Sequence, residues 1–355
     1  MRSLVRDNGL AGITAVPGGI AVHSDIFKSG GHAMNLKHLK WVSLAGLLSC
    51  GGGGGPDPNA TQSQASTTNP FVFVVMMENH DASQIYGNTK EAPYINSLLS
   101  TYAYANQYTT TVHPSEPNYI WLEAGSNNTG DITFTTDNDP SATNSTATTQ
   151  HLVTQLVAAG LTWRSYQEGL DASTGACPIT SASSRPEYYA AKHDPFVFFQ
   201  DVSGNPPAAT NAFCATHHAP YTQLATDLSS GNVANYTFIT PNLCDDMHGA
   251  SGCNSKLIQK GDAWLKGNLP QLISWVNAHG GVVFVVWDEG SSTNPPQPFV
   301  AVGPHVKAGY GSPVAFTHSS TLKSVEEIFG LALVRGAGDP ATNDLSDLFV
   351  PGFFP

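Results

Sequence analysis

Four short stretches of the chain are apolar at nearly every position. They are rich in β-branched and aromatic residues and span Phe71–Met77, Tyr236–Thr240, Val282–Trp287 and Phe299–Val302. Runs of this length without polar alternation are typical of buried parallel strands. Five other segments repeat apolar residues at three- and four-residue spacing, which predicts helices over Glu91–Ala103, Thr148–Ala159, Tyr221–Leu228, Ala263–Asn277 and Thr321–Leu331. Strands that alternate with helices predict an α/β fold with a central, mostly parallel sheet flanked by helices on both faces.

The first 70 residues differ in character from the rest. Residues 34–49 join a basic start to a short apolar run, and the ending Leu47-Leu48-Ser49-Cys50 is similar to a bacterial lipoprotein signal. We therefore expect residues 1–33 to lie upstream of the true start, residues 34–49 to be a signal peptide, and Cys50 to be lipidated. An ordinary secretory signal is the alternative. Residues 50–70, rich in Gly, Ser and Thr, are expected to form a flexible tether to one large domain over residues 71–355.

This reading places the protein outside the cytoplasm. We expect an exported lipoprotein, anchored to a membrane of the cell envelope, with secretion as the alternative. The four remaining cysteines form an even set in a chain routed through an oxidising compartment, so two disulfides are expected. Proximity in the sequence suggests Cys244 with Cys253 and Cys177 with Cys214. A metal cluster is the other interpretation of these cysteines.

The charge balance narrows the function classes. The 355 residues contain 15 Lys plus Arg against 27 Asp plus Glu, a net charge of -12. No broad basic surface is available to follow a nucleic-acid backbone, so nucleic acid is not an expected partner. No apolar run has the length of a permanent membrane helix, which argues against a polytopic membrane protein. A chain this acidic repels an anionic substrate unless a bound divalent cation reverses the local field.

Polar clusters follow three of the predicted strands. They are Glu78-Asn79-His80-Asp81, the segment from Pro241 to His248, and Asp288-Glu289-Gly290. In such a sheet the carboxyl ends of the strands form the ligand-binding edge, so these clusters should converge. Neighbouring buried carboxylates need a compensating cation. Their oxygen atoms favour one Mg²⁺, Ca²⁺ or Mn²⁺ ion, with Zn²⁺ as the alternative.

A further candidate lies in the segment from Thr110 to Gly125. Pro117 and the apolar pattern after it predict a helix that begins just beyond Ser115. A serine at this place is commonly a helix N-cap, and that is the competing interpretation. The N-terminus of a helix also offers free N–H donors and a positive dipole end, which suits a hydroxyl that attacks a phosphate.

Seven segments together resemble a known family. In chain order they are MMENHD, APYINSLL, HPSEPNY, FITPNLCDDMHG, VVWDEG, FVAVGPHVKAG and THSSTLKSVEEIFGL. This order is similar to that of the phosphoesterase family of acid phosphatases and phospholipases C, and the closest resemblance is to short bacterial acid phosphatases and phosphatidylinositol phosphatases. The resemblance implies a phosphoesterase domain with an alkaline-phosphatase-like fold.

The resemblance also implies roles for individual residues. Metal ligands are implied at Glu78, Asn79, Ser115, Asp288 and Glu289. Ser115 corresponds to the nucleophile, in preference to Ser126. The residues that would border the phosphate or assist catalysis are His113, His248, His318, Asn118, Asp246 and Asn138. Asp245 is the alternative to Asp246, and Asp137 the alternative to Asn138.

The expected activity is metal-dependent hydrolysis of phosphate monoesters through a phosphoserine intermediate. Ser115 would attack phosphorus, and His248 or His318 would protonate the leaving oxygen. A phospholipase C-type phosphodiesterase is one alternative, and a non-catalytic ligand-binding lipoprotein is another. The region Cys177–Cys214 is expected to decide the leaving group. The expected partners are a phosphate ester substrate and, through the lipid anchor, a membrane.

Overall fold

The structure is a computed structural model that describes residues 70–355, apart from residues 111, 172–174, 185, 353 and 355. The predicted signal peptide, the lipidation site at Cys50 and the tether up to residue 69 lie outside the described residues. No helix within these described ranges is long and apolar enough to cross a membrane.

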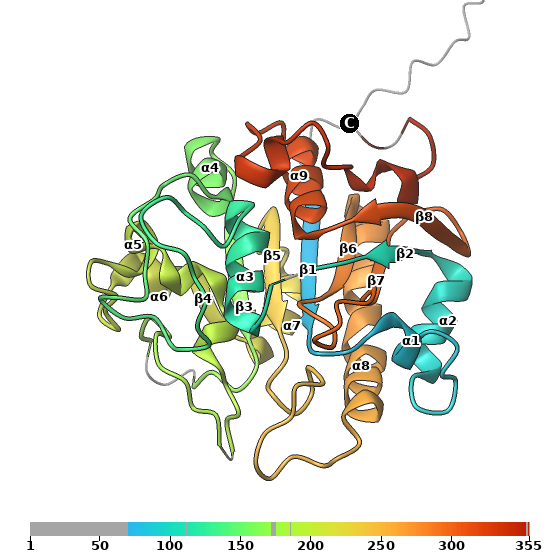
Figure 1. The fold of residues 1–355 in the computed structure, drawn as a ribbon, viewed down its shortest axis with the longest axis horizontal. Coiled ribbons are helices and arrows are strands. Elements are labelled where there is room, and N and C mark those ends of the chain that lie inside the picture. Colours follow the sequence, from blue (N-terminus) through green and yellow to red (C-terminus); the bar gives the residue numbers. More distant parts are fainter. Residues whose placement is uncertain (1–69, 111, 172–174, 185, 353, 355) are drawn as a thin grey trace, which may run out of the picture. The chain divides into compact units, whose positions relative to one another are not determined.

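Eight strands form the central sheet of the described chain (Figure 1). In chain order they are β1 (Phe71–Met77), β2 (Ala103–Tyr108), β3 (Trp163–Gln167), β4 (His218–Pro220), β5 (Tyr236–Thr240), β6 (Gly281–Trp287), β7 (Phe299–Val302) and β8 (Tyr310–Phe316). Their order across the sheet is β4-β3-β5-β1-β6-β7-β2-β8. Strand β1 pairs in parallel with β5 and β6, and Val74 lies opposite both Phe238 and Phe284. The predicted mostly parallel α/β sheet is therefore confirmed.

One strand departs from the expected direction. The sequence suggested a parallel strand at Phe299–Val302, but β7 is antiparallel to both of its neighbours, β6 and β2. A parallel pairing needs a crossover of a dozen or more residues, usually with a helix. The link from β6 to β7, residues 288–298, contains no helix. The chain therefore turns back on itself, and the apolarity of β7 reflects burial on both faces rather than direction.

Nine α-helices accompany the strands within the described residues. They are α1 (Ala82–Ile85), α2 (Pro93–Thr101), α3 (Ser115–Ala124), α4 (Leu152–Ala158), α5 (Gln200–Ser203), α6 (Ala212–His217), α7 (Leu224–Ser230), α8 (Leu257–His279) and α9 (His318–Ile328). All five helices predicted from apolar spacing are present with shifted ends. The largest difference is α8, which extends beyond the predicted Ala263–Asn277 at both ends and continues through Pro270.

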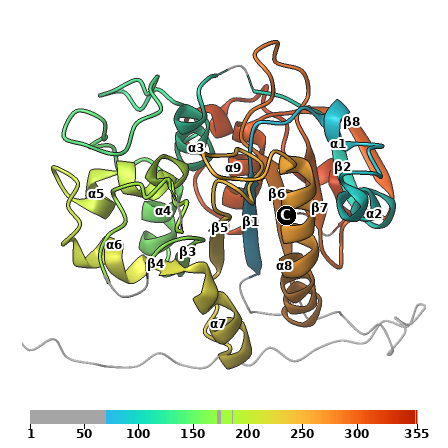
Figure 2. The same cartoon turned by 90° about the horizontal axis from the view of Figure 1, so that it is seen from below.

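The helices cover both faces of the sheet (Figure 2). Along β1, Val72, Val74 and Met76 belong to the core shared with α3, α4 and α9. The alternate residues Phe73, Val75 and Met77 belong to the core shared with α2, α7 and α8. Full burial of each such side chain stabilises the fold by about 1.5–3 kcal/mol. Strand β1 is thus held from both sides, which places the residue after Met77 firmly at the end of the sheet.

Four strands of the sheet were not predicted from the sequence pattern. Strands β2, β3 and β8 mix polar with apolar positions, and β4 is only three residues long. They lie away from the sheet centre, where continuous apolarity is not required. The two predicted disulfides are present: Cys177–Cys214 with Cα atoms 5.1 Å apart, and Cys244–Cys253 with Cα atoms 5.4 Å apart.

Candidate active site

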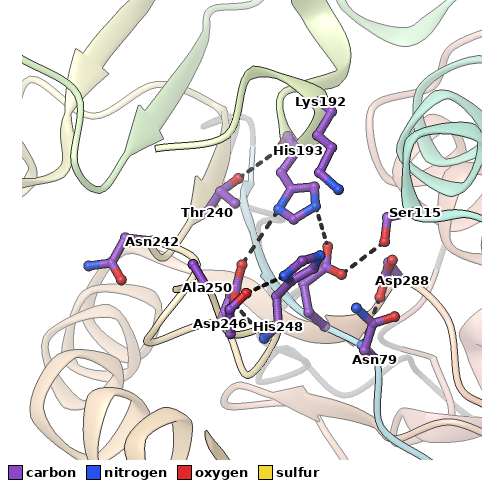
Figure 3. Close-up of polar contacts among 12 residues, drawn as sticks. Asn79, Ser115, Lys192, His193, Thr240, Asn242, Asp246, His248, Ala250 and Asp288 are labelled. Carbon is purple, nitrogen blue, oxygen red and sulfur yellow. Dashed lines mark hydrogen bonds and ion pairs between the residues drawn. The ribbon is translucent and has the colours of Figure 1, made fainter. Parts of the chain in front are cut away.

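Three carboxylates meet at the carboxyl ends of β1, β5 and β6, which are adjacent in the sheet (Figure 3). Glu78 directly follows β1 and donates its backbone N–H to the carbonyl of Asp246 at 2.8 Å. Asp288 directly follows β6, and its backbone N–H bonds the carbonyl of Met77 at 3.0 Å. All three side chains are completely buried. The structure therefore brings the strand-end clusters together as the sheet topology requires.

Two residues in this region have left-handed backbone conformations. Asn79 has φ 54° and Met247 has φ 83°. Asparagine tolerates this conformation, whereas for methionine it is strained by about 1–3 kcal/mol. The turn at Asn79 directs its backbone N–H to Asp288 Oδ1 at 3.1 Å. Backbone strain of this kind persists where the surroundings require it, and here it directly follows Asp246, whose carbonyl accepts the Glu78 N–H.

Ser115 is the first residue of α3, and Pro114 occupies the N-cap position. The Ser115 hydroxyl does not cap the helix; it donates a hydrogen bond to Glu78 Oε2 at 3.1 Å. The side chain is nearly buried, with 2% of the residue exposed. Of the two interpretations of this serine, N-cap or site residue, the geometry supports the second.

The Glu78 carboxylate is the centre of the cluster. Besides Ser115, its Oε1 atom accepts the Tyr119 hydroxyl at 2.5 Å, and His193 Nε2 lies 3.3 Å from the same oxygen. Burial raises the pKa of Glu78 well above its usual range, and the charges of Asp288 and Asp246 raise it further. Without a compensating positive charge, the ionised form of this cluster is therefore unfavourable.

The donor set fits a divalent cation. The buried Oδ2 atoms of Asp246 and Asp288 make no hydrogen bond within the described part of the chain. Glu78, His193 and His248 each offer a ligand atom, and these atoms lie within 4.8 Å of one another. Unsatisfied buried carboxylate oxygens beside neutral imidazoles are the environment that a cation would stabilise.

Both of these histidines are suited to metal binding. Burial lowers the pKa of His193 well below its usual range and also lowers that of His248, so both rings are neutral near pH 7. His248 Nδ1 donates to the carbonyl of Gly249 at 2.7 Å, which leaves the Nε2 lone pair free. His193 therefore enlarges the predicted all-oxygen ligand set to a mixed one, which Zn²⁺, Mn²⁺ or another transition metal accepts.

Glu289 has partners of its own and also interacts with the Ser115 side chain, a hydrogen bond that lowers the pKa of its carboxyl. Its Oε2 atom lies 2.7 Å from His113 Nδ1 and accepts Asn118 Nδ2 at 3.2 Å. Burial and the Asp288 charge raise the pKa of Glu289 to about 8. His113 Nε2 contacts Asn294 Oδ1 at 2.7 Å, so both ring nitrogens are used. In this arrangement Glu289 holds His113 and Asn118, and it also adjoins the Ser115 hydroxyl, which in turn donates to Glu78.

His318 is placed differently from the expected proton donor. It is fully buried; Nε2 donates to the carbonyl of Asp288 at 2.6 Å, and Nδ1 accepts the Tyr108 hydroxyl at 2.9 Å. Burial lowers its pKa to about 4. A neutral ring with both nitrogens engaged has no proton to give, which argues against the expected role. His318 instead positions the Asp288 backbone.

The phosphate-bordering candidates separate clearly. Asp246 lies against Glu78, whereas Asp245 pairs with Lys260 at 3.1 Å, so Asp246 is the member of this pair that belongs to the site. Asn138 is exposed, and its backbone N–H donates to Glu116 Oε2 at 2.8 Å. Asp137 forms an ion pair with Lys192. Lys192 directly precedes His193, which lies beside Glu78, so Asp137 is the one of these two residues whose contact lies nearer to the Glu78 cluster.

Three residues of the site were missed in the sequence. His193 and Lys192 come from the 3-10 turn η1 (Ala191–His193), within the Cys177–Cys214 region, and Tyr119 comes from α3. The His193 ring stacks on Tyr119 with centroids 5.0 Å apart. The available signal was the polar triplet Lys192-His193-Asp194 within an otherwise apolar, aromatic stretch. It follows no predicted strand, so the strand-end argument could not find it.

Sequence comparisons give a consistent result. The profile described as the phosphoesterase family matches residues 88–332. A phosphatidylinositol-3-phosphatase of Mycobacterium tuberculosis is 32% identical over 293 residues, which cover 82% of this chain and 86% of that protein. A phosphate-repressible acid phosphatase of Penicillium chrysogenum is 26% identical over 239 residues, covering 63% of this chain and 51% of the fungal protein. The chain thus spans about half the length of this fungal relative.

Solved structures with a similar fold are more distant in sequence. A phosphonate monoester hydrolase from Silicibacter pomeroyi superposes with a TM-score of 0.50 and 12% identity, covering 81% of this chain and 78% of the other. A Bacteroides thetaiotaomicron protein described within the metabolism of multiple glycosaminoglycans has a TM-score of 0.52 and 12% identity, covering 79% and 82%. At this identity the likeness shows a shared fold.

Proposed function

This chain belongs to the phosphoesterase family, and we propose that it hydrolyses phosphate monoesters in a metal-dependent reaction that passes through a phosphoserine at Ser115. It is a phosphoric ester hydrolase, like the phosphatases with which it aligns. The observation that carries the finer proposal is the Ser115 hydroxyl, which lies at the start of a helix and bonds a buried carboxylate that has two further carboxylates beside it.

The chain's own residues orient the nucleophile. Glu78 accepts the Ser115 proton in a hydrogen bond, the Tyr119 hydroxyl holds the other carboxylate oxygen in place, and His193 Nε2 lies 3.3 Å from that oxygen. Ser115 stands at the N-terminus of α3, whose positive dipole end favours a phosphate against its hydroxyl. When bound, a divalent cation among Glu78, Asp246, Asp288, His193 and His248 supplies positive charge that offsets phosphate charge and lowers the pKa of a neighbouring hydroxyl.

The reaction then proceeds in two displacements. Ser115 Oγ attacks phosphorus in line, the P–O bond to the alcohol breaks, and the alcohol leaves with a proton. Water next attacks the phosphoserine and releases phosphate, which restores the serine. Both histidines considered for protonating the leaving oxygen keep their ring proton in a hydrogen bond to a backbone carbonyl, His248 to Gly249 and His318 to Asp288, so in this proposal the leaving oxygen takes its proton from water.

Residues 34–50 support a further proposal on localisation. We keep the interpretation of an exported lipoprotein anchored at Cys50, with secretion as the alternative. The two disulfides are consistent with passage through an oxidising compartment. Mass spectrometry of the mature N-terminus distinguishes a lipidated Cys50 from an unmodified end.

A panel of esters with and without metal tests the activity. Its substrates are para-nitrophenyl phosphate, an inositol monophosphate, chosen because the mycobacterial relative is named a phosphatidylinositol-3-phosphatase, and phosphatidylcholine as a diester. We expect turnover of monoesters, a loss of about 100-fold or more after chelation, and recovery on adding one of Mg²⁺, Mn²⁺, Ca²⁺ or Zn²⁺. Faster cleavage of phosphatidylcholine favours the phosphodiesterase, and no turnover at all favours the non-catalytic binding protein. Activity that survives complete metal removal contradicts the metal dependence.

A further inference from the structure

A positive charge lies close to the start of α3, the helix that carries the proposed nucleophile. The Lys192 side chain is 15% exposed, which is low for a lysine, and its ammonium pairs with Asp137. Figure 3 shows Lys192 extending from the His193 backbone toward the side of the site that holds Ser115. Besides the effects of burial and of neighbouring carboxylates, the Lys192 charge lowers the pKa of Glu78 and Glu289. The ammonium is therefore within electrostatic reach of both strand-end clusters.

One carboxylate connects Lys192 with the start of α3. Asp137 Oδ1 accepts the backbone N–H of Glu116 at 3.4 Å, and Asp137 Oδ2 faces the Lys192 ammonium. Glu116 directly follows Ser115. The Lys192 ammonium and the Glu116 amide thus hold the Asp137 carboxylate one residue away from the proposed nucleophile. A phosphate accepts hydrogen bonds from the same two kinds of donor.

The backbone around Lys192 is well anchored. The carbonyl of His193 accepts the Thr240 hydroxyl at 3.2 Å, and the N–H of Ala191 donates to Ser181 Oγ at 2.8 Å. The neighbouring His193 ring is buried and stacked on Tyr119. Lys192 therefore extends from a rigid base, so little conformational freedom remains to be lost when it contacts a ligand.

We propose that Lys192 recognises the second negative charge of a phosphate monoester and thereby sets the preference for monoesters over diesters. A monoester carries up to two charges on three free oxygens. In a diester one of those oxygens bears a second organic group, which would leave the ammonium facing an uncharged atom. The inference rests on the proposed function, and it assigns to one residue the selectivity expected of the Cys177–Cys214 region.

The test measures selectivity rather than rate alone. The ratio of kcat/KM for para-nitrophenyl phosphate to that for bis-para-nitrophenyl phosphate is compared in the wild type, Lys192→Gln, Lys192→Arg and Lys266→Gln. Lys266 is an exposed lysine of α8, so its replacement makes the same change in net charge away from the site. We expect Lys192→Gln to lower the ratio by about 10- to 100-fold. Lys192→Arg should restore most of it, and Lys266→Gln should leave it unchanged.

Equal losses with both esters, or an unchanged ratio in Lys192→Gln, would overturn the inference. Calorimetric binding of inorganic phosphate provides a readout that needs no turnover, and Lys192→Gln should weaken it about tenfold or more. If the wild type binds phosphate through Lys192 but hydrolyses no ester, the proposed function is rejected, and anion recognition by Lys192 remains. If the wild type hydrolyses monoesters, and Lys192→Gln changes neither the ester selectivity nor phosphate binding, the inference is rejected and the proposed function remains.

Discussion

Ser115→Ala should lower kcat for a phosphate monoester by about 10⁴-fold or more, because it removes the atom that forms the bond to phosphorus. The change deletes a single oxygen at the first position of α3, where Pro114 already provides the N-cap, so the helix should remain intact. Since Glu78, Asp246, Asp288 and the two histidines stay in place, metal content should be retained. Steady-state kinetics together with elemental analysis of the purified variant check both expectations.

Ser126→Ala is the matched control for this variant. Ser126 lies just beyond the end of the same helix, and its hydroxyl accepts a hydrogen bond from the backbone N–H of Asn128 at 3.0 Å. Its replacement should leave kcat within about twofold, because Ser126 lies at the opposite end of α3 from Ser115. If Ser115→Ala kept a tenth of the wild-type rate, Ser115 could not be the nucleophile.

Glu78→Gln should lower activity by about 10³-fold or more and also abolish stable metal binding. The substitution keeps the size of the side chain but removes the charge that lies between Ser115, Tyr119 and His193. Neutralising one of several adjoining carboxylates weakens attraction for a cation and frees the Ser115 hydroxyl. Elemental analysis after dialysis, followed by turnover with added metal, measures the two losses separately.

The stability of Glu78→Gln distinguishes a functional charge from a structural one. The folded-state pKa of Glu78 is raised by burial and by Asp288 and Asp246, so its ionised form destabilises the metal-free fold above the ordinary carboxyl pKa. Removing the charge should therefore leave the thermal midpoint of the metal-free protein unchanged or higher at pH 7. A large loss of stability would instead identify Glu78 as a structural residue.

Glu326→Gln is the control that tests whether the loss of any buried carboxyl lowers metal binding and turnover. Glu326 of α9 is fully buried, and burial raises its pKa to about 8, yet its contacts are to the backbone of Val334. The variant loses the same kind of buried carboxyl away from Ser115. Metal content and turnover should both stay close to those of the wild type.

The pattern of apolar runs predicted the part of the site that depends on the sheet. Strands β1 and β6 are buried on both faces, so continuous apolarity revealed them, and the residues that follow them, Glu78 and Asp288, could be expected at one edge. Ser115 could be identified because a helix start has its own sequence signature. These inferences rest on local sequence and one topological rule.

Other parts depend on contacts between distant segments. His193 comes from a 3-10 turn, and only the folded chain shows that its ring stacks on Tyr119 and reaches Glu78. His318 was expected as a site residue; its two hydrogen bonds, to Tyr108 and to the Asp288 backbone, occupy both ring nitrogens, which only the folded chain shows. The predicted direction of β7 was wrong, because apolarity indicates burial and carries no information on whether a strand runs parallel or antiparallel to its neighbours.

Acid-quenched protein from a reaction with a monoester tests the central claim most directly. Peptide mass spectrometry should find phosphate on Ser115 in the metal-loaded wild type, and the modification should be absent after chelation and in Glu78→Gln. Phosphate on another residue of an active sample, or the same yield on Ser115 with metal removed, would contradict a cation-assisted serine nucleophile.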